Sequence, residues 1–146
     1  MSLAEGVAGW LGGNVPGLTW QSDGSAYPDG TVGIYAEQLP SGPDVAVAVL
    51  TSSGQPSDSL LGWDMPALEV RVRGDRDPRT SQGIAQQIYS ALHGLADVEL
   101  PDGTWLGLAV CLDSGPTTSA PDEQGRWQWV VGVDLQVLAP SEHRPA

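Results

Sequence analysis

The sequence lacks lysine and phenylalanine, and it contains a single cysteine among 146 residues. Without lysine it cannot form a Walker-type phosphate loop, because that loop needs a lysine to bind the phosphates. One cysteine, Cys111, excludes an internal disulfide framework. Cys111 lies in the apolar run of residues 105–112, which favours a small buried core residue over a reactive thiol.

Long hydrophobic runs are also absent. No apolar stretch approaches the ~20 residues that a membrane-spanning helix requires, and no basic segment followed by a long apolar run resembles a secretory signal. We therefore expect no membrane partner, and a chain that stays in a reducing cytoplasm unless an assembly carries it out.

Positive charge is scarce. Six arginines face 18 acidic residues, so the formal net charge is −12. Proteins that bind duplex DNA draw much of their affinity from lysine and arginine at the phosphates. The charge therefore argues against sequence-specific DNA binding and favours soluble partners with complementary patches.

The first half of the chain predicts one short helix and two strands. Residues 2–11 have a capping serine and an apolar face, and the helix is expected to stop at residues 12–14. Residues 31–39 and 44–51 alternate as strands and are predicted to form a hairpin. Residues 52–66 are predicted to be a long polar loop, which tends to be functional or mobile.

The second half carries the clearest patterns. Residues 67–74 alternate as a strand, and Asp77 and Pro78 then cap and start an amphipathic helix that Gly94 ends. Residues 104–112 and 126–138 predict two more strands, with a short extra one at 97–100. The last strand has six apolar residues at a two-residue period, and the tryptophans Trp105, Trp127 and Trp129 are expected in the core.

These elements predict an α+β fold with a mixed, mostly antiparallel sheet and helices packed on one face. Residues 1–139 are expected to form one domain, and residues 140–146 a flexible C-terminal tail. Such a sheet leaves one face and at least one edge exposed, and a protein that assembles can use that edge.

Catalytic and metal-binding patterns are weak. Asp75 and Asp77 have a spacing used for divalent cations, but Asp77 is needed as the helix cap and the neighbouring arginines would neutralise the site. His93 and His143 lack the nucleophile and orienting group of a hydrolase. We therefore expect no enzyme activity, no cofactor and no metal. Trp63, in the predicted loop, is a candidate partner contact.

The arginines are unevenly placed. Residues 69–79 hold four of the six, with three acids, so the rest of the chain carries two arginines against fifteen acids. A basic patch on an acidic body suits head-to-tail contact between identical copies. The alternative is local pairing with Glu69, Asp75 and Asp77, which contributes little. The candidate contact residues are Arg71, Arg73, Asp75, Arg76, Arg79, Trp63 and Arg126.

One segment resembles a known family. Residues 70–74 read VRVRG, Asp77 and Pro78 follow, and Ile84, Ile88 and Leu92 precede His93 and Gly94. Together with a leading helix, an earlier strand pair and a GP…DEQGRW loop over residues 115–127, this pattern resembles the tail terminators of long-tailed phages. These proteins are also labelled minor capsid or minor tail proteins. The resemblance covers most of residues 2–138.

The resemblance implies a structural virion protein of the tail neck, assembled in the host cytoplasm. It would form a ring, six-fold, at the head-proximal end of the tail tube, end tube polymerisation and offer a surface for the head–tail connector protein. Its partners would be its own copies, the tube protein and the connector, and DNA would only pass through the bore. The alternatives are another head–tail connector or tail-tube protein, or a small ligand-binding module that uses Trp63 and the loops.

Overall fold

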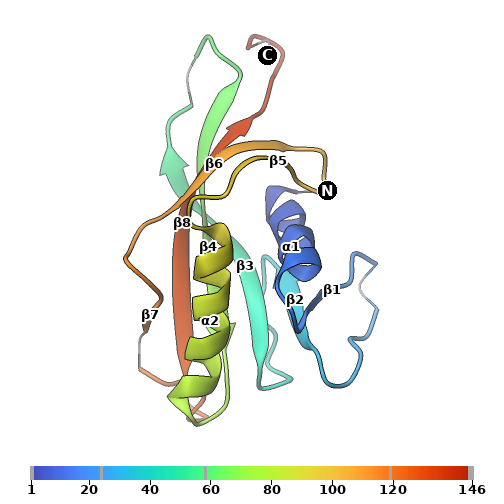
Figure 1. Cartoon of the computed structure of the whole chain (residues 1–146), viewed down its shortest axis with the longest axis vertical. Coiled ribbons are helices and arrows are strands. Elements are labelled where there is room, and N and C mark those ends of the chain that lie inside the picture. Colours follow the sequence, from blue (N-terminus) through green and yellow to red (C-terminus); the bar gives the residue numbers. More distant parts are fainter. Residues whose placement is uncertain (1, 24, 58, 119, 145–146) are drawn as a thin grey trace.

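The computed structural model describes residues 2–144 except 24, 58 and 119. Within this part of the chain, two helices accompany one sheet in the strand order β1-β2-β3-β4-β8-β6-β5, with β7 added beside β8 (Figure 1). The elements are α1 Leu3–Asn14, β1 Leu18–Trp20, β2 Val32–Ala36, β3 Ala46–Gln55, β4 Trp63–Arg73, α2 Pro78–Leu92, β5 Ala96–Glu99, β6 Trp105–Cys111, β7 Thr117–Thr118 and β8 Gln128–Leu138.

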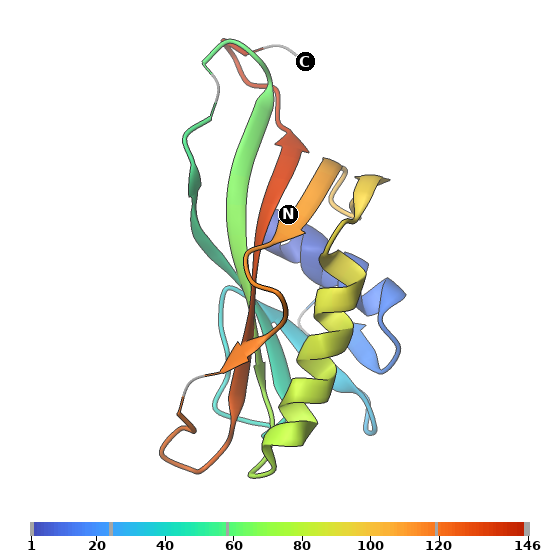
Figure 2. The same ribbon diagram turned by 60° about the vertical axis from the view of Figure 1, so that its left-hand side comes forward.

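The sheet is mixed. The β3–β4, β4–β8, β8–β6 and β6–β5 pairs are antiparallel, as is the β7–β8 pair. The β1–β2 and β2–β3 pairs are parallel. Both helices lie on the same side of the sheet, and no helix of the described residues covers the other face (Figure 2). The predicted α+β class, with a mostly antiparallel sheet covered by helices on one face, is confirmed.

The core forms between this covered face and the helices. Alternating residues of β4 and β8 point into it, and so do the inner residues of α1 and α2. The periodicity of the two long strands therefore predicted the core correctly. The core members from these two strands are Leu68, Val70, Val72, Val131, Val133, Leu135 and Val137.

The helix ends follow local rules with one exception. Asp77 caps α2 by accepting a hydrogen bond from the backbone N–H of Arg79, and Gly94 ends it at φ 85°. Ser2 caps α1 through the N–H of Glu5, as predicted. However, α1 continues past Gly12 to Asn14. A Cβ at Gly12 would lie 2.9 Å from the backbone nitrogen of Trp20, so this glycine permits close packing of α1 on β1.

The predicted hairpin of residues 31–39 and 44–51 is wrong. Strands β2 and β3 pair in parallel, with Ile34 opposite Val47. Glu37, at φ 65°, turns the chain back, and its carboxylate accepts hydrogen bonds from the N–H and hydroxyl of Thr51. The chain then returns along residues 38–45 before β3 begins. Alternation reports which residues face the core, but it is the same for parallel and antiparallel pairing.

The predicted long loop at residues 52–66 is also wrong. Strand β3 runs to Gln55 and β4 begins at Trp63, so residues 56–62 form the connection of a long hairpin. The polar outer half of β3 is exposed on both faces, which hides its strand period. A Cβ at Gly54 would lie 2.2 Å from the carbonyl oxygen of Met65, so glycine permits the two strands to approach.

The ends of the sheet hold two further differences. The short strands β1 and β7 were not predicted. Trp105, expected in the core, is 40% exposed, because it faces away from the helices. In the C-terminal segment, Arg144 donates hydrogen bonds to the carbonyl oxygens of Leu61 and Trp63 and forms a 2.6 Å ion pair with Asp64. Residues 145–146 of the predicted tail lie outside the described residues.

Candidate functional site

Two of the candidate contact arginines are buried. Arg73 is 3% exposed, and its guanidinium donates to the carbonyl oxygens of Pro40, Pro43 and Asp44 at 2.5, 2.6 and 2.8 Å. Burial, and then the nearby charge of Arg126, lower the pKa of Arg73. Arg73 therefore holds the 38–45 return loop within its own protomer. Because its side chain is buried there, it has almost no surface to offer a second chain.

Arg126 acts in the same way from the other side of this loop. It is 7% exposed, donates to the carbonyl oxygen of Ser41 at 2.7 Å, and pairs with Asp122 at 2.9 Å and Asp44 at 3.3 Å. Backbone and side-chain hydrogen bonds from Arg126 hold the pKa of Asp122 below its usual value. Arg73 and Arg126 therefore have an internal structural role within one protomer, and their predicted contact role stays a prediction.

The other arginines of the cluster are exposed and locally paired. Arg71 forms a 2.8 Å ion pair with Glu69 and donates to Gln128 at 3.0 Å. Arg79 pairs with Asp77 at 2.9 Å while its side chain stays 84% exposed, and hydrogen bonds from Arg79 lower the pKa of Asp77. Such exposed pairs contribute little stability. These arginines can therefore exchange partners without cost to the fold.

The turn between β4 and α2 forms a charged end of the molecule. Asp75 accepts hydrogen bonds from the N–H of Asp77 and the hydroxyl of Thr80, so its carboxylate shapes the turn. Arg76 lies over Gly125 and donates to the carbonyl oxygen of Gln124. Among the described residues no three His, Cys, Asp or Glu side chains gather as metal ligands. A shallow hollow is lined here by Asp44, Asp75, Arg76, Asp77, Gln124 and Arg126.

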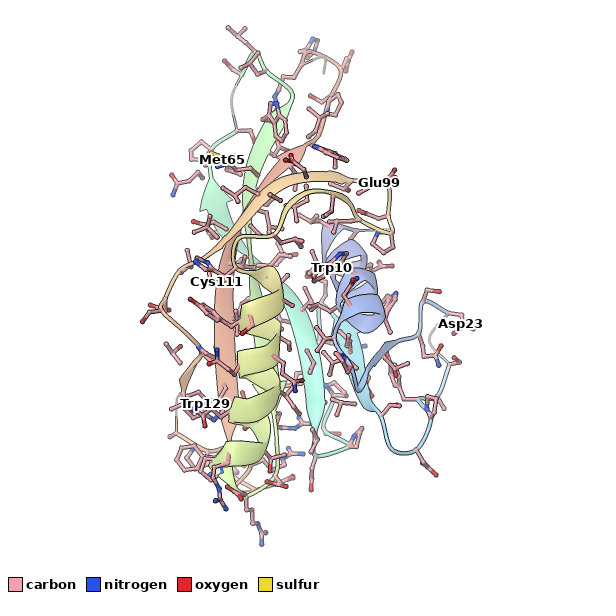
Figure 3. The ribbon with its side chains drawn as sticks, viewed as in Figure 1. Trp10, Asp23, Met65, Glu99, Cys111 and Trp129 are labelled. Atoms are coloured by element: carbon pink, nitrogen blue, oxygen red, sulfur yellow. The ribbon has the colours of Figure 1, made fainter. Side chains whose placement is uncertain are left out.

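The opposite end of the long axis exposes large apolar side chains beside the Arg144–Asp64 ion pair. Trp63 and Trp105 flank Leu138 in one row across β4, β8 and β6, on the face away from the helices. The Trp63 ring lies on Gly107, where a Cβ would approach it to 3.0 Å. Met65 lies near this end and Trp129 near the charged end (Figure 3). The exposed large hydrophobic side chains of the described residues are Leu60, Leu61, Trp63, Met65, Trp105, Val110 and Leu112.

A hollow beside the parallel strands was not predicted. It is an open groove of about 740 Å³ beside β1 and β2, lined in part by Trp20, Tyr27 and Tyr35. The two tyrosine rings meet edge to face at 5.2 Å, and the Tyr27 hydroxyl donates to the carbonyl oxygen of Ile34. Tyr27 lies in a segment rich in glycine, proline and aspartate, so no periodic pattern marked it.

Cys111 is a core residue. It is 7% exposed, burial raises its pKa to about 11, and its backbone N–H donates to Nδ1 of His93 at 3.0 Å. The His93 ring in turn stacks on Tyr89. His93 therefore supports the junction of α2 and β6. No helix in the described part of the chain has the length and apolarity needed to cross a bilayer.

A sheet with helices on one face only, and with large apolar side chains exposed on the other, has the features of a structural protein that packs against other proteins. The family model for bacteriophage tail terminator proteins matches residues 14–138. The chain therefore belongs to the bacteriophage tail terminator family, which confirms the resemblance, and it is a structural component of a phage tail. No curated protein sequence matches it significantly.

Proposed function

We propose that the chain forms a ring at the head-proximal end of the tail tube, where it ends tube polymerisation and offers a surface for head–tail joining. The observation that carries the proposal is the polarity of the molecule. The hairpin of β3 and β4 and the β4–α2 turn lie at opposite ends of the long axis (Figure 1), and the first exposes large apolar side chains while the second is lined by charged ones.

The two ends suit interfaces of different lifetime. Apolar surfaces are typical of obligate interfaces, whereas charged rims govern specificity and the rate of encounter. We assign the apolar end to lasting contacts within the collar. The exposed Arg71, Asp75, Arg76 and Arg79 at the other end remain candidates for contacts with the tube or the connector. A body of net charge −12 would let DNA pass through a bore without adhering.

The test is deletion of the gene from the phage, with electron microscopy of the particles and complementation by the wild-type gene. We expect tails of irregular, excessive length that are not joined to heads, and normal particles after complementation. Tails of normal length joined to heads in the deletion strain would refute the proposal. Immunogold label along the tube shaft, instead of at the neck, would favour the tube-subunit alternative.

A further inference from the structure

The exposed apolar side chains gather on one surface. Trp63 and Met65 come from β4, Trp105 and Val110 from β6, and Leu112 follows β6 against Gly132. Their strand registers place all of them on the face away from the helices. We call these five residues the bare-face patch. Leu60 and Leu61, 75% and 62% exposed, extend it at the hairpin tip.

The patch and the tip together expose on the order of 600 Å² of apolar surface, which reaches the upper limit for a monomer. One partner in a standard interface contributes roughly 800 Å². Strand β8 places two polar side chains in this area, Asp134 between Val110 and Ala67 and the exposed Gln136 opposite Leu108, and Glu69 lies at its edge opposite Gly132. The bare-face patch and the hairpin tip are therefore large enough and apolar enough to be covered in the assembled protein.

A second surface, on helix α2, lacks the acidic residues that are frequent in the rest of the chain. Helix α2 contains no Asp or Glu over its 15 residues, although the chain has 18 acids. Its exposed side chains include Gln82, Gln86, Gln87 and Ser90. Between α2 and the end of α1 lies a groove without charged side chains, lined by Asn14, Val15, Pro16, Gln86, Gln87, Ser90 and Ala91.

We propose that the bare-face patch of one copy packs on the helix side of the next copy, with Leu60 and Leu61 in the groove between its α1 and α2. This inference rests on the proposed ring and names the contact that builds it. Copies of net charge −12 repel one another, so they associate best where carboxylates are few. The patch and the groove meet this condition, and one offers a protruding tip where the other is hollow.

The two surfaces lie on opposite faces of the sheet, so the contact is heterologous. A heterologous contact generates a closed ring when its rotation closes, whereas patch-on-patch contact yields a dimer. Patch-on-patch contact would also bring the Asp134 carboxylates of both copies into one apolar interface. The Arg144 hydrogen bonds to the carbonyl oxygens of Leu61 and Trp63 hold the hairpin tip in place for docking.

Cysteine cross-linking tests this contact directly, since the buried Cys111 thiol gives little background. Tails are isolated from cells that make Leu61→Cys and Gln87→Cys chains together, then oxidised and run on a non-reducing gel. We expect a disulfide-linked dimer only when both variants are present. The control pair combines Leu61→Cys with Glu123→Cys, an exposed site in the turn of residues 122–125, and should give no dimer.

Three results would overturn the inference: no cross-link in tails that contain both chains, a dimer from Leu61→Cys alone, or a cross-link to a different tail protein. A charge variant gives an independent readout. Gln86→Glu with Gln87→Glu should reduce incorporation into tails at least about tenfold, because it places carboxylates against an apolar patch. The matched control, Gln38→Glu with Ser22→Glu, adds the same two charges at exposed positions and should incorporate normally.

These outcomes separate the inference from the proposed function. If the deletion strain makes normal tails, the proposed function fails. If wild-type chain restores tail length and head joining, but the Gln86 and Gln87 double variant does so equally well, only the contact is wrong. Thermal unfolding of each purified variant should match that of the wild type, since all four substituted residues are exposed.

Discussion

Replacement of Arg73 by methionine should strongly destabilise the protein. The guanidinium is the hydrogen-bond donor for three carbonyl oxygens of the 38–45 return loop, at Pro40, Pro43 and Asp44. Methionine keeps most of the aliphatic packing but leaves the three acceptors without their donor. The loop connects β2 to β3, so its loss would loosen the parallel half of the sheet.

The magnitude follows from the number of bonds. A hydrogen bond with a charged donor contributes about 1.5–3 kcal/mol. Loop movement and hydration of the freed carbonyls recover part of this, so we expect a loss of about 3 kcal/mol in the free energy of unfolding. For a domain of this size that is a fall in Tm of about 10 °C. Arg73→Lys should be intermediate, since an ammonium cannot reach three carbonyls as a planar fork does.

The assay is urea unfolding followed by tryptophan fluorescence, with thermal unfolding as a second measurement. The matched control is Arg71→Met, because Arg71 lies two residues away on β4 but is one-third exposed and pairs with Glu69. We expect the control to lose less than about 1 kcal/mol. Equal losses for the two variants would refute the assignment of Arg73 as an internal clamp.

Three further predictions concern a helix end, acid stability and the thiol. Gly94→Ala should cost about 1 kcal/mol because Gly94 has φ 85°, whereas Gly13→Ala, in equally open space within α1, should cost nothing in urea unfolding. The pKa of the Asp122 carboxyl lies below its usual 3.8. Its pairing with Arg126 therefore stabilises the fold above that pH, and this stabilisation is lost as the pH falls below it. Asp122→Asn should reduce this loss of stability at acid pH. An unchanged dependence of the free energy of unfolding on pH would contradict the prediction. Cys111, with a pKa of about 11, should react with a thiol reagent at pH 8 far more slowly in the native than in the urea-unfolded chain.

Local patterns determined several parts of this protein. Alternation over β4 and β8 fixed their inward residues, and the sequence Asp77, Pro78 and Gly94 fixed both ends of α2. The same segment carried the resemblance to the tail terminator family, which the family match confirmed. These features depend on neighbours within a few residues, so periodicity and capping rules are sufficient to predict them.

The tertiary structure alone decided how the strands pair and where charges and aromatic rings lie. Parallel pairing of β2 with β3 depends on Arg73 and Arg126, which reach across more than 25 residues to the return loop. Arg71 and Arg73 share a strand face, yet one is exposed and the other buried, because only Arg73 is covered by that loop. Trp63 and Trp105 lie on either side of Leu138 because the sheet register pairs both with that residue. Contacts between distant segments are set by the folded sheet, and a periodic pattern contains no information about them.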